Sequence, residues 1–221
     1  MRAVVLANSP EAPHSNWLQS VEGDAFLVGV DGGTRFILEA GLVPDLVIGD
    51  LDSLSAETVL HLRKNSVVYS YPRDKNLTDL ELALLYCVRE KFESIEVYAW
   101  ADERIDYMTS TLNFVSLLKA PIRLYGKRHH IEIITSGQGE RPWSAKEVGR
   151  NLSIGSYSKR LSLNSSGLVW NLELKGVSGP YMSQSNRIND VGSLKVSEGS
   201  AFLIWDFDNM NEGGLKTAYE K

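Results

Sequence analysis

The sequence has 221 residues, of which 43% are hydrophobic and 23% are charged, and its formal net charge is −5. This balance is typical of a globular protein, and it excludes a disordered or fibrous chain. No apolar run approaches the roughly 20 residues that a membrane-spanning helix needs. The sequence also lacks the strong basic run that would indicate binding to nucleic acid. The single cysteine, Cys87, excludes an intrachain disulfide and falls at an apolar position of a helical pattern, where we expect a small buried side chain.

Up to about residue 135, short apolar segments alternate with helical patterns. Strands are predicted at residues 4–7, 26–30, 46–48, 67–71, 95–100 and 122–125, and helices over 34–41, 56–64 and 106–118. The clearest helix follows Thr78 and Glu81, which form a capping box. Continuous apolar strands separated by helices predict an α/β fold, a doubly wound and mostly parallel sheet that is covered on both faces.

After about residue 140 the helical pattern gives way to alternation with a period of two. Strands are predicted at residues 152–154, 161–163, 168–174, 194–196 and 201–205, separated by turn signals such as Ser166-Gly167 and Gly179-Pro180. This pattern predicts a smaller antiparallel β-sandwich. We therefore expect two domains, residues 1–138 and residues 139–221, with a loosely held polar tail from Asn209.

Aspartates recur where the predicted strands of the first half end. Asp31 follows the strand at 26–30, and Asp50 and Asp52 follow the strand at 46–48. Four more lie after later strands, namely Asp74, Asp79, Asp102 and Asp106. Because the carboxyl ends of parallel strands meet at one edge of a sheet, we expect these carboxylates to gather there. Their mutual repulsion is relieved by a hard divalent cation, and Mg²⁺ favours carboxylates together with substrate phosphates.

Glycines next to these aspartates support a phosphate site. Gly32, Gly33 and Gly49 would let a polyphosphate approach the backbone, and the helix that follows offers free N–H groups. Taken singly, Asp52 or Asp79 would more often be a helix N-cap, and Asp31-Gly32-Gly33 would more often be a turn. The recurrence at successive strand ends is what favours function. No G-x-x-x-x-G-K-[ST], G-x-S-x-G or G-x-G-x-x-G pattern offers another site.

A phosphatase is the alternative that the same residues allow. In Asp50-Leu51-Asp52-Ser53 the first aspartate would be a nucleophile and the second an acid. Leu54 stands where that signature usually has Thr or Val, and the motif does not follow the first strand of the chain.

Several of these segments resemble the thiamine pyrophosphokinase family. The matching segments are Asp31-Gly32-Gly33, residues 42–53 with the pattern P-D-x-x-x-G-D-x-D-S, residues 75–83 (KNLTDLELA), Arg104-Ile105-Asp106 and Ser185-Asn186. The resemblance spans most of the chain and is strongest between residues 31 and 83.

The resemblance implies the same two-domain fold and a homodimer. Residues 1–138 would bind ATP and Mg²⁺ and carry the chemistry, and residues 139–221 would bind substrate and form the dimer. Thiamine would lie between the first domain of one chain and the β-sandwich of the other, and the products would be thiamine diphosphate and AMP. No signal segment is visible before the first strand, and cysteine is scarce, so we expect the cytoplasm as the location.

The resemblance also implies roles for individual residues. Asp50, Asp52 and Asp79 would hold the metal; Asp31, Gly32, Gly33, Lys75 and Thr78 would lie at the nucleotide; Arg104 would bind the triphosphate; and Ser185 and Asn186 would meet the substrate. Asp79 or Asp106 would accept the proton of the attacking hydroxyl. Trp170 and Trp205 are candidates for stacking on the cationic substrate, although core packing explains such tryptophans equally well.

Several positions depart from the family pattern, among them Ser9 in place of a Gly and Thr34-Arg35 in place of Ala-Asn. Tyr107 stands in place of a His, Glu103 in place of a Gly, Asn76 in place of an Asp, and Arg187 in place of a Glu. Arg187 brings positive charge close to the expected position of a cationic substrate. Two alternatives therefore stay open: the same transfer to another small alcohol, such as a hydroxymethylpterin, and a nucleotide-binding protein without turnover.

Overall fold

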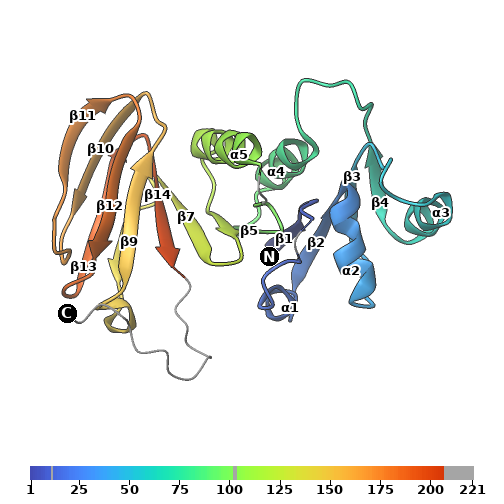
Figure 1. Ribbon diagram of the computed structural model, residues 1–221, viewed down its shortest axis with the longest axis horizontal. Coiled ribbons are helices and arrows are strands. Elements are labelled where there is room, and N and C mark those ends of the chain that lie inside the picture. The colour runs from blue at the N-terminus through green and yellow to red at the C-terminus, as the bar shows by residue number, and fades with distance from the viewer. Residues whose placement is uncertain (11, 102–103, 207–221) are drawn as a thin grey trace.

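The computed structural model describes residues 1–206, except 11, 102 and 103, and it contains two β-sheets (Figure 1). In spatial order the ten-stranded sheet consists of β12 (Tyr181–Arg187), β9 (Asn151–Ser156), β14 (Ser200–Asp206), β7 (His129–Thr135), β6 (Ile122–Tyr125), β5 (Ser94–Tyr98), β1 (Arg2–Leu6), β2 (Ala25–Val30), β3 (Leu46–Gly49) and β4 (Val67–Ser70). The four-stranded sheet consists of β11 (Glu173–Ser178), β10 (Arg160–Ser165), β13 (Gly192–Glu198) and β8 (Glu140–Trp143). Asp102, Glu103 and the tail from Asn209 lie outside the described residues.

Helices cover both faces of the parallel part of the large sheet, in which the six strands from β6 to β4 run in the same direction. The helices are α1 (Trp17–Ser20), α2 (Thr34–Glu39), α3 (Ala56–Asn65), α4 (Asp79–Arg89) and α5 (Ile105–Leu117), with 3-10 turns η1 (Asp31–Gly33) and η2 (Ala145–Glu147). Successive strand residues point to opposite faces, so Val5 packs under α4 and α5 whereas Val4 and Leu6 pack against α1 and α2. The predicted fold class is confirmed (Figure 1).

One smaller expectation from the sequence is also met. Cys87 is a buried free thiol in α4, and burial raises its pKa to about 12, so it packs as a small hydrophobic residue. In the part of the chain that the structure describes, no helix combines the length and the apolar character needed to cross a membrane.

The second sheet packs against the antiparallel end of the large sheet, and β14 contributes side chains to two hydrophobic cores. Phe202 faces the core under α4 and α5, whereas Leu203 and Trp205 face the core between the two sheets. β7 pairs with β6 on one side and with β14 on the other, so the large sheet continues across residue 138. The domain boundary at that residue stays a prediction.

The strand predicted at residues 168–174 is wrong for residues 168–172 and confirmed for residues 173–174, which open β11. Only Leu168 makes an isolated bridge, to Ile188, and β11 begins at Glu173. Side chains take the backbone N–H groups that a neighbouring strand would have bound: Asn171 accepts from Leu168 at 3.0 Å, Asn186 from Trp170 at 3.2 Å and Ser165 from Leu172 at 2.8 Å. The alternating apolar residues therefore belong to a loop, of which only Leu168 is buried.

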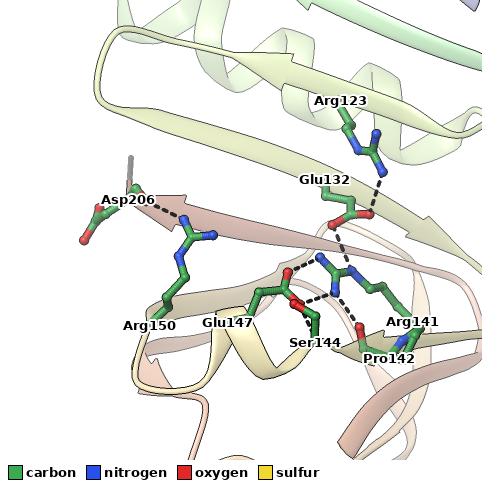
Figure 2. Close-up of polar contacts among 8 residues, drawn as sticks. All are labelled: Arg123, Glu132, Arg141, Pro142, Ser144, Glu147, Arg150 and Asp206. Atoms are coloured by element: carbon green, nitrogen blue, oxygen red, sulfur yellow. Dashed lines mark hydrogen bonds and ion pairs between the residues drawn. The ribbon is translucent and has the colours of Figure 1, made fainter. Parts of the chain in front are cut away.

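A buried charge network joins the two sheets (Figure 2). The guanidinium of Arg141, on β8, contacts Glu132 of β7 at 3.1 Å and both carboxylate oxygens of Glu147 at 2.7 and 3.0 Å. It also lies 5.3 Å from the ring centroid of Trp205. Because Arg141 presents a planar fork of donors, one side chain can bind two carboxylates on different elements.

Candidate active site

A cavity of about 740 Å³ opens beyond the carboxyl ends of the parallel strands. In the sheet β1 lies between β2 and β5, so the strand order reverses beside it, and such switch points are where open α/β sheets bind ligands. The lining comes from five strand ends: residues 7–9 after β1, 30–31 at β2, 50 after β3, 73 and 75–80 after β4, and 99, 100, 104, 106, 107, 110 and 111 after β5. Asp74, which was predicted to lie at this edge, does not line the cavity. The predicted convergence of the strand ends is therefore present in the fold.

Three aspartates at this edge lie close enough to share one cation. Asp31, Asp50 and Asp52 each offer a carboxylate oxygen within 4.8 Å of the others. Asp31 opens η1 directly after β2, and the other two follow β3, where Oδ1 of Asp50 accepts the backbone N–H of Asp52 at 3.2 Å. Asp52 is exposed, with Arg73 3.7 Å away. Local backbone geometry and neighbouring strands together bring the three side chains to one point.

The backbone around the cavity is strained. Three residues other than glycine have left-handed φ values directly after strands: Asp31 at 45°, Leu51 at 63° and Ala99 at 53°. Such conformations cost on the order of 1–3 kcal/mol each and persist where surrounding structure imposes them, often at functional sites. Their gathering at the ends of β2, β3 and β5 therefore supports the assignment of this edge as the site.

Asp31 is the most buried of the three aspartates, with 8% of its surface exposed. Its Oδ2 accepts hydrogen bonds from Nδ2 of Asn8 at 2.9 Å and from the hydroxyl of Ser53. Its Oδ1 is buried and has no hydrogen-bond partner among the described residues. A buried carboxylate oxygen without a partner is costly, and hard oxygen donors of this kind fit Mg²⁺, so this residue set fits a divalent cation.

Asp79 was predicted as a metal ligand, and the structure places it beside the group of three. Its carboxylate lies 3.0 Å from Nζ of Lys75, four residues earlier. Burial raises the pKa of Asp79, the Lys75 ammonium opposes that shift, and the charges of Asp50 and Asp31 add to it. Asp79 and Lys75 both line the cavity. The observed group thus contains Asp31 where the prediction had Asp79, and the role of Asp79 stays a prediction.

Of the other predicted nucleotide and phosphate residues, Thr78 and Arg104 line the cavity, whereas Gly32 and Gly33 do not. Thr78 caps α4 in the predicted capping box, accepting from the N–H of Glu81 at 3.2 Å. Arg104 is exposed; it binds both carboxylate oxygens of Asp106, and its guanidinium lies 4.1 Å from the ring centroid of Tyr107. Hydrogen bonding from Arg104 lowers the pKa of Asp106. The guanidinium is thereby held at the mouth of the cavity.

The predicted glycines are required by close packing. A Cβ at Gly32 would lie 2.6 Å from Oδ1 of Asn8, and a Cβ at Gly49 would lie 2.9 Å from Cβ of Asp31. A Cβ at Gly33 would lie 2.4 Å from the carbonyl oxygens of both Leu6 and Ala7. η1 therefore sits directly on the end of β1, and this contact places Asp31.

We expect Gly33→Ala to destabilise the fold by about 1–3 kcal/mol, because the carbonyls that it meets belong to the central strand and cannot move aside. Gly33 has a negative φ, and without such contacts a Gly→Ala change at a negative φ stabilises the folded state by about 0.4–1 kcal/mol. The sign of the change in the free energy of unfolding therefore shows whether the close contact dominates. Urea unfolding followed by tryptophan fluorescence measures the change. Gly126→Ala is the matched control, since its nearest contact would be an ordinary 3.4 Å. Equal stability of the two variants would contradict the packing argument.

The predicted substrate residues of the second half lie elsewhere. Asn186 is fully buried on β12, and its amide donates to the carbonyl of Trp170 at 2.7 Å. Ser185 and Trp170 are exposed, whereas Trp205 is fully buried in the core between the sheets. None of these four lines the cavity.

Sequence reasoning did not assign roles to Asn8 and Ser53, the hydrogen-bond partners of Asp31. Asn8 follows β1 and lines the cavity, so its position at a strand end was the signal that could have identified it. Ser53 directly follows the aspartate pair in the chain, but only the fold shows that it reaches Asp31.

Comparisons with known proteins match part of this chain to one family. Residues 18–125 match the family described as "Thiamin pyrophosphokinase, catalytic domain". The chain is similar to the thiamine pyrophosphokinase of Bacillus subtilis (strain 168), with 28% identity over 115 residues. That alignment covers 50% of this chain and 54%, about half, of the relative.

Crystal structures extend the likeness in fold to nearly the whole chain. Thiamine pyrophosphokinase from Bacillus subtilis superposes with a TM-score of 0.78 at 23% identity, covering 94% of this chain and 100% of that one. The enzyme from Geobacillus thermodenitrificans gives 0.75 at 24% identity, covering 95% and 99%.

Proposed function

We propose that this chain transfers a diphosphoryl group from ATP to the hydroxyl of thiamine and releases AMP. The premise is that residues 18–125 belong to the family of thiamin pyrophosphokinase catalytic domains. The observation that carries the proposal is the group Asp31, Asp50 and Asp52: each offers a carboxylate oxygen within 4.8 Å of those of the other two. In addition, the buried Oδ1 of Asp31 has no hydrogen-bond partner among the described residues.

Mg²⁺ held by these three carboxylates would neutralise charge on the transferring phosphoryl oxygens. Phosphoryl transfer otherwise depends on positioning and on further positive charge. Arg104, held by Asp106 and stacked on Tyr107, would bind phosphate oxygens from the mouth of the cavity. Lys75, between Asp79 and the carbonyl of Pro72, would supply a second positive charge.

Asp79 is the better candidate for accepting the hydroxyl proton. Burial and two neighbouring carboxylates raise its pKa, and a raised pKa makes a carboxylate a stronger base. Asp106, whose pKa Arg104 lowers, is a weaker base and is already engaged in an ion pair.

Residues of the β-sandwich would reach thiamine only from a second copy of the chain. β12, which carries Ser185 and Asn186, is five strands away from β5 in the large sheet. At about 4.8 Å per strand this separation is about 24 Å, which is too far for one small substrate to bridge. A homodimer, in which the exposed Ser185 and Trp170 face the partner's cavity, is therefore part of the proposal.

The test is an assay that separates the possible products. With ATP, thiamine and Mg²⁺ we expect AMP and thiamine diphosphate in equal amounts, and neither product without thiamine or after chelation of the metal. ADP as the nucleotide product would reject diphosphoryl transfer. Phosphate release from simple phosphoesters would favour the phosphatase alternative at Asp50.

A second acceptor is favoured by one observation. Tyr107 lines the cavity and presents an exposed ring beside Arg104, at the position where the family pattern has a His. Thermal shift with ATP and Mg²⁺, comparing thiamine with hydroxymethylpterins, distinguishes the two acceptors. A selective shift with a pterin would replace thiamine in the proposal and leave the chemistry unchanged.

A further inference from the structure

Arg35 contacts the loop after β1 through several hydrogen bonds at once. Its Nη1 donates to Oδ1 of Asn8 at 2.9 Å and to the carbonyl of Gly32 at 3.2 Å, and its Nη2 donates to the carbonyl of Ser9. The guanidinium also lies 4.3 Å from the ring centroid of Phe36. Arg35 does not line the cavity itself, but Asn8 and Ser9 do.

The contact with Arg35 fixes the orientation of the Asn8 amide. A guanidinium only donates hydrogen bonds, so it selects the oxygen of the amide and turns the nitrogen away. That nitrogen donates to Oδ2 of Asp31 at 2.9 Å. Gly32 leaves the room for this arrangement, because a Cβ there would lie 2.6 Å from Oδ1 of Asn8. With Arg35 absent, the amide would lose the contact that holds its oxygen, and only its hydrogen bond to Asp31 would fix its position.

Asn8 and Ser53 together occupy Oδ2 of Asp31, so Oδ1 is the oxygen left for a cation. We propose that Arg35 is a positioning residue for the divalent-cation site, acting through Asn8 on the carboxylate of Asp31. This inference rests on the cation site of the proposed function and adds the residues that set its geometry.

A simple charge argument predicts the opposite effect. Arg35 is a cation linked to the carboxylate of Asp31 through Asn8, and removing a nearby positive charge should strengthen the binding of another cation. Positioning predicts weaker binding, because outer-shell partners of metal ligands are worth about 10–100-fold in affinity. The sign of the change therefore separates the two explanations.

The experiment is a titration of the full chain with Mn²⁺ alone, following the electron paramagnetic resonance signal of the free ion. We expect Arg35→Ala and Arg35→Lys each to weaken Mn²⁺ binding by about tenfold or more, since lysine keeps the charge but not the fork of donors. Arg63→Ala, at an exposed position of α3, is the matched control and should bind as the unaltered protein does. Unchanged or tighter binding by Arg35→Ala would overturn the inference.

Asn8→Ala gives an independent test that leaves Arg35 in place. We expect a similar loss of Mn²⁺ affinity, and the double variant Arg35→Ala/Asn8→Ala should lose no more than either single one, because both changes break the same relay. Additive losses would contradict the relay. If the unaltered protein binds no Mn²⁺, the proposed cation site itself fails and the inference fails with it, whereas equal binding by all variants removes only the inference.

Discussion

Asp50→Asn is expected to lower the rate of AMP formation by about a thousandfold. The change keeps the shape of the side chain but removes one of the three charges that would hold the cation. Metal-assisted stabilisation of charge in a transition state is worth several kcal/mol, and about 4 kcal/mol corresponds to about three powers of ten in rate. Initial rates at saturating ATP, thiamine and Mg²⁺ give the measurement.

The matched control is Asp24→Asn, which makes the same change of charge at an exposed position just before β2. We expect the control to retain full activity. A loss of less than about tenfold for Asp50→Asn would contradict a catalytic cation at this group, and it would also remove the phosphatase alternative, in which Asp50 is the nucleophile.

Stability provides a second measurement on the same variant. Binding of a ligand to the folded state at about 100 times its Kd stabilises that state by about 2.7 kcal/mol, so Mg²⁺ should raise the melting temperature of the unaltered protein. Asp50→Asn should lose most of this rise. Without metal, the variant should be at least as stable as the unaltered protein, because one of three mutually repelling carboxylates is gone.

The sequence predicted those features of the site that depend on local chemistry. The capping box of Thr78 and Glu81 involves residues three apart, so spacing alone identifies it. Aspartates after buried strands predict one acidic edge because parallel strands place their carboxyl ends together. Which aspartates form the closest group depends on side-chain directions, and Asp31 rather than Asp79 joins Asp50 and Asp52 for that reason.

Long-range contacts explain what the sequence could not show. The pairing of β7 with β14 joins residues about 70 positions apart, and no local pattern indicates it. The same limit applies to residues 168–172, where the amide of Asn186 binds the backbone of Trp170 and an alternating pattern no longer implies a strand. Left-handed backbone at Leu51 and Ala99 is also hidden, since those residue types normally avoid it.

Arg141→Met is expected to destabilise the fold by about 3–5 kcal/mol, the usual result of removing one partner from a buried ion pair. The substitution keeps much of the volume but leaves two carboxylates without their shared partner (Figure 2). Only 12% of the side chain of Glu132 and 14% of that of Glu147 are exposed. Glu132 keeps a 3.5 Å contact with Arg123, so most of the cost should fall on Glu147. Urea unfolding at neutral pH gives the value, and Arg160→Met, at an exposed pair with Glu198, is the control.

The pH dependence of that difference tests its cause. Burial alone would raise the pKa of Glu147, but hydrogen bonds from Arg141 and Ser144 lower it to about 2 from an ordinary 4.5. A lowered pKa in the folded state contributes stability that is present above pH 4.5 and is lost as the pH falls toward 2. In Arg141→Met the unpaired Glu147 should instead take up a proton readily, and the neutral form tolerates burial. The stability difference between the two proteins should therefore begin to shrink above pH 4.5, where Glu147 of the variant takes up its proton, and continue to shrink as the pH falls toward about 2. If the stability difference stays constant down to pH 3, the unpaired charge is not the cause of the destabilisation. The cause would then be lost packing against Trp205, whose ring centroid lies 5.3 Å from the guanidinium.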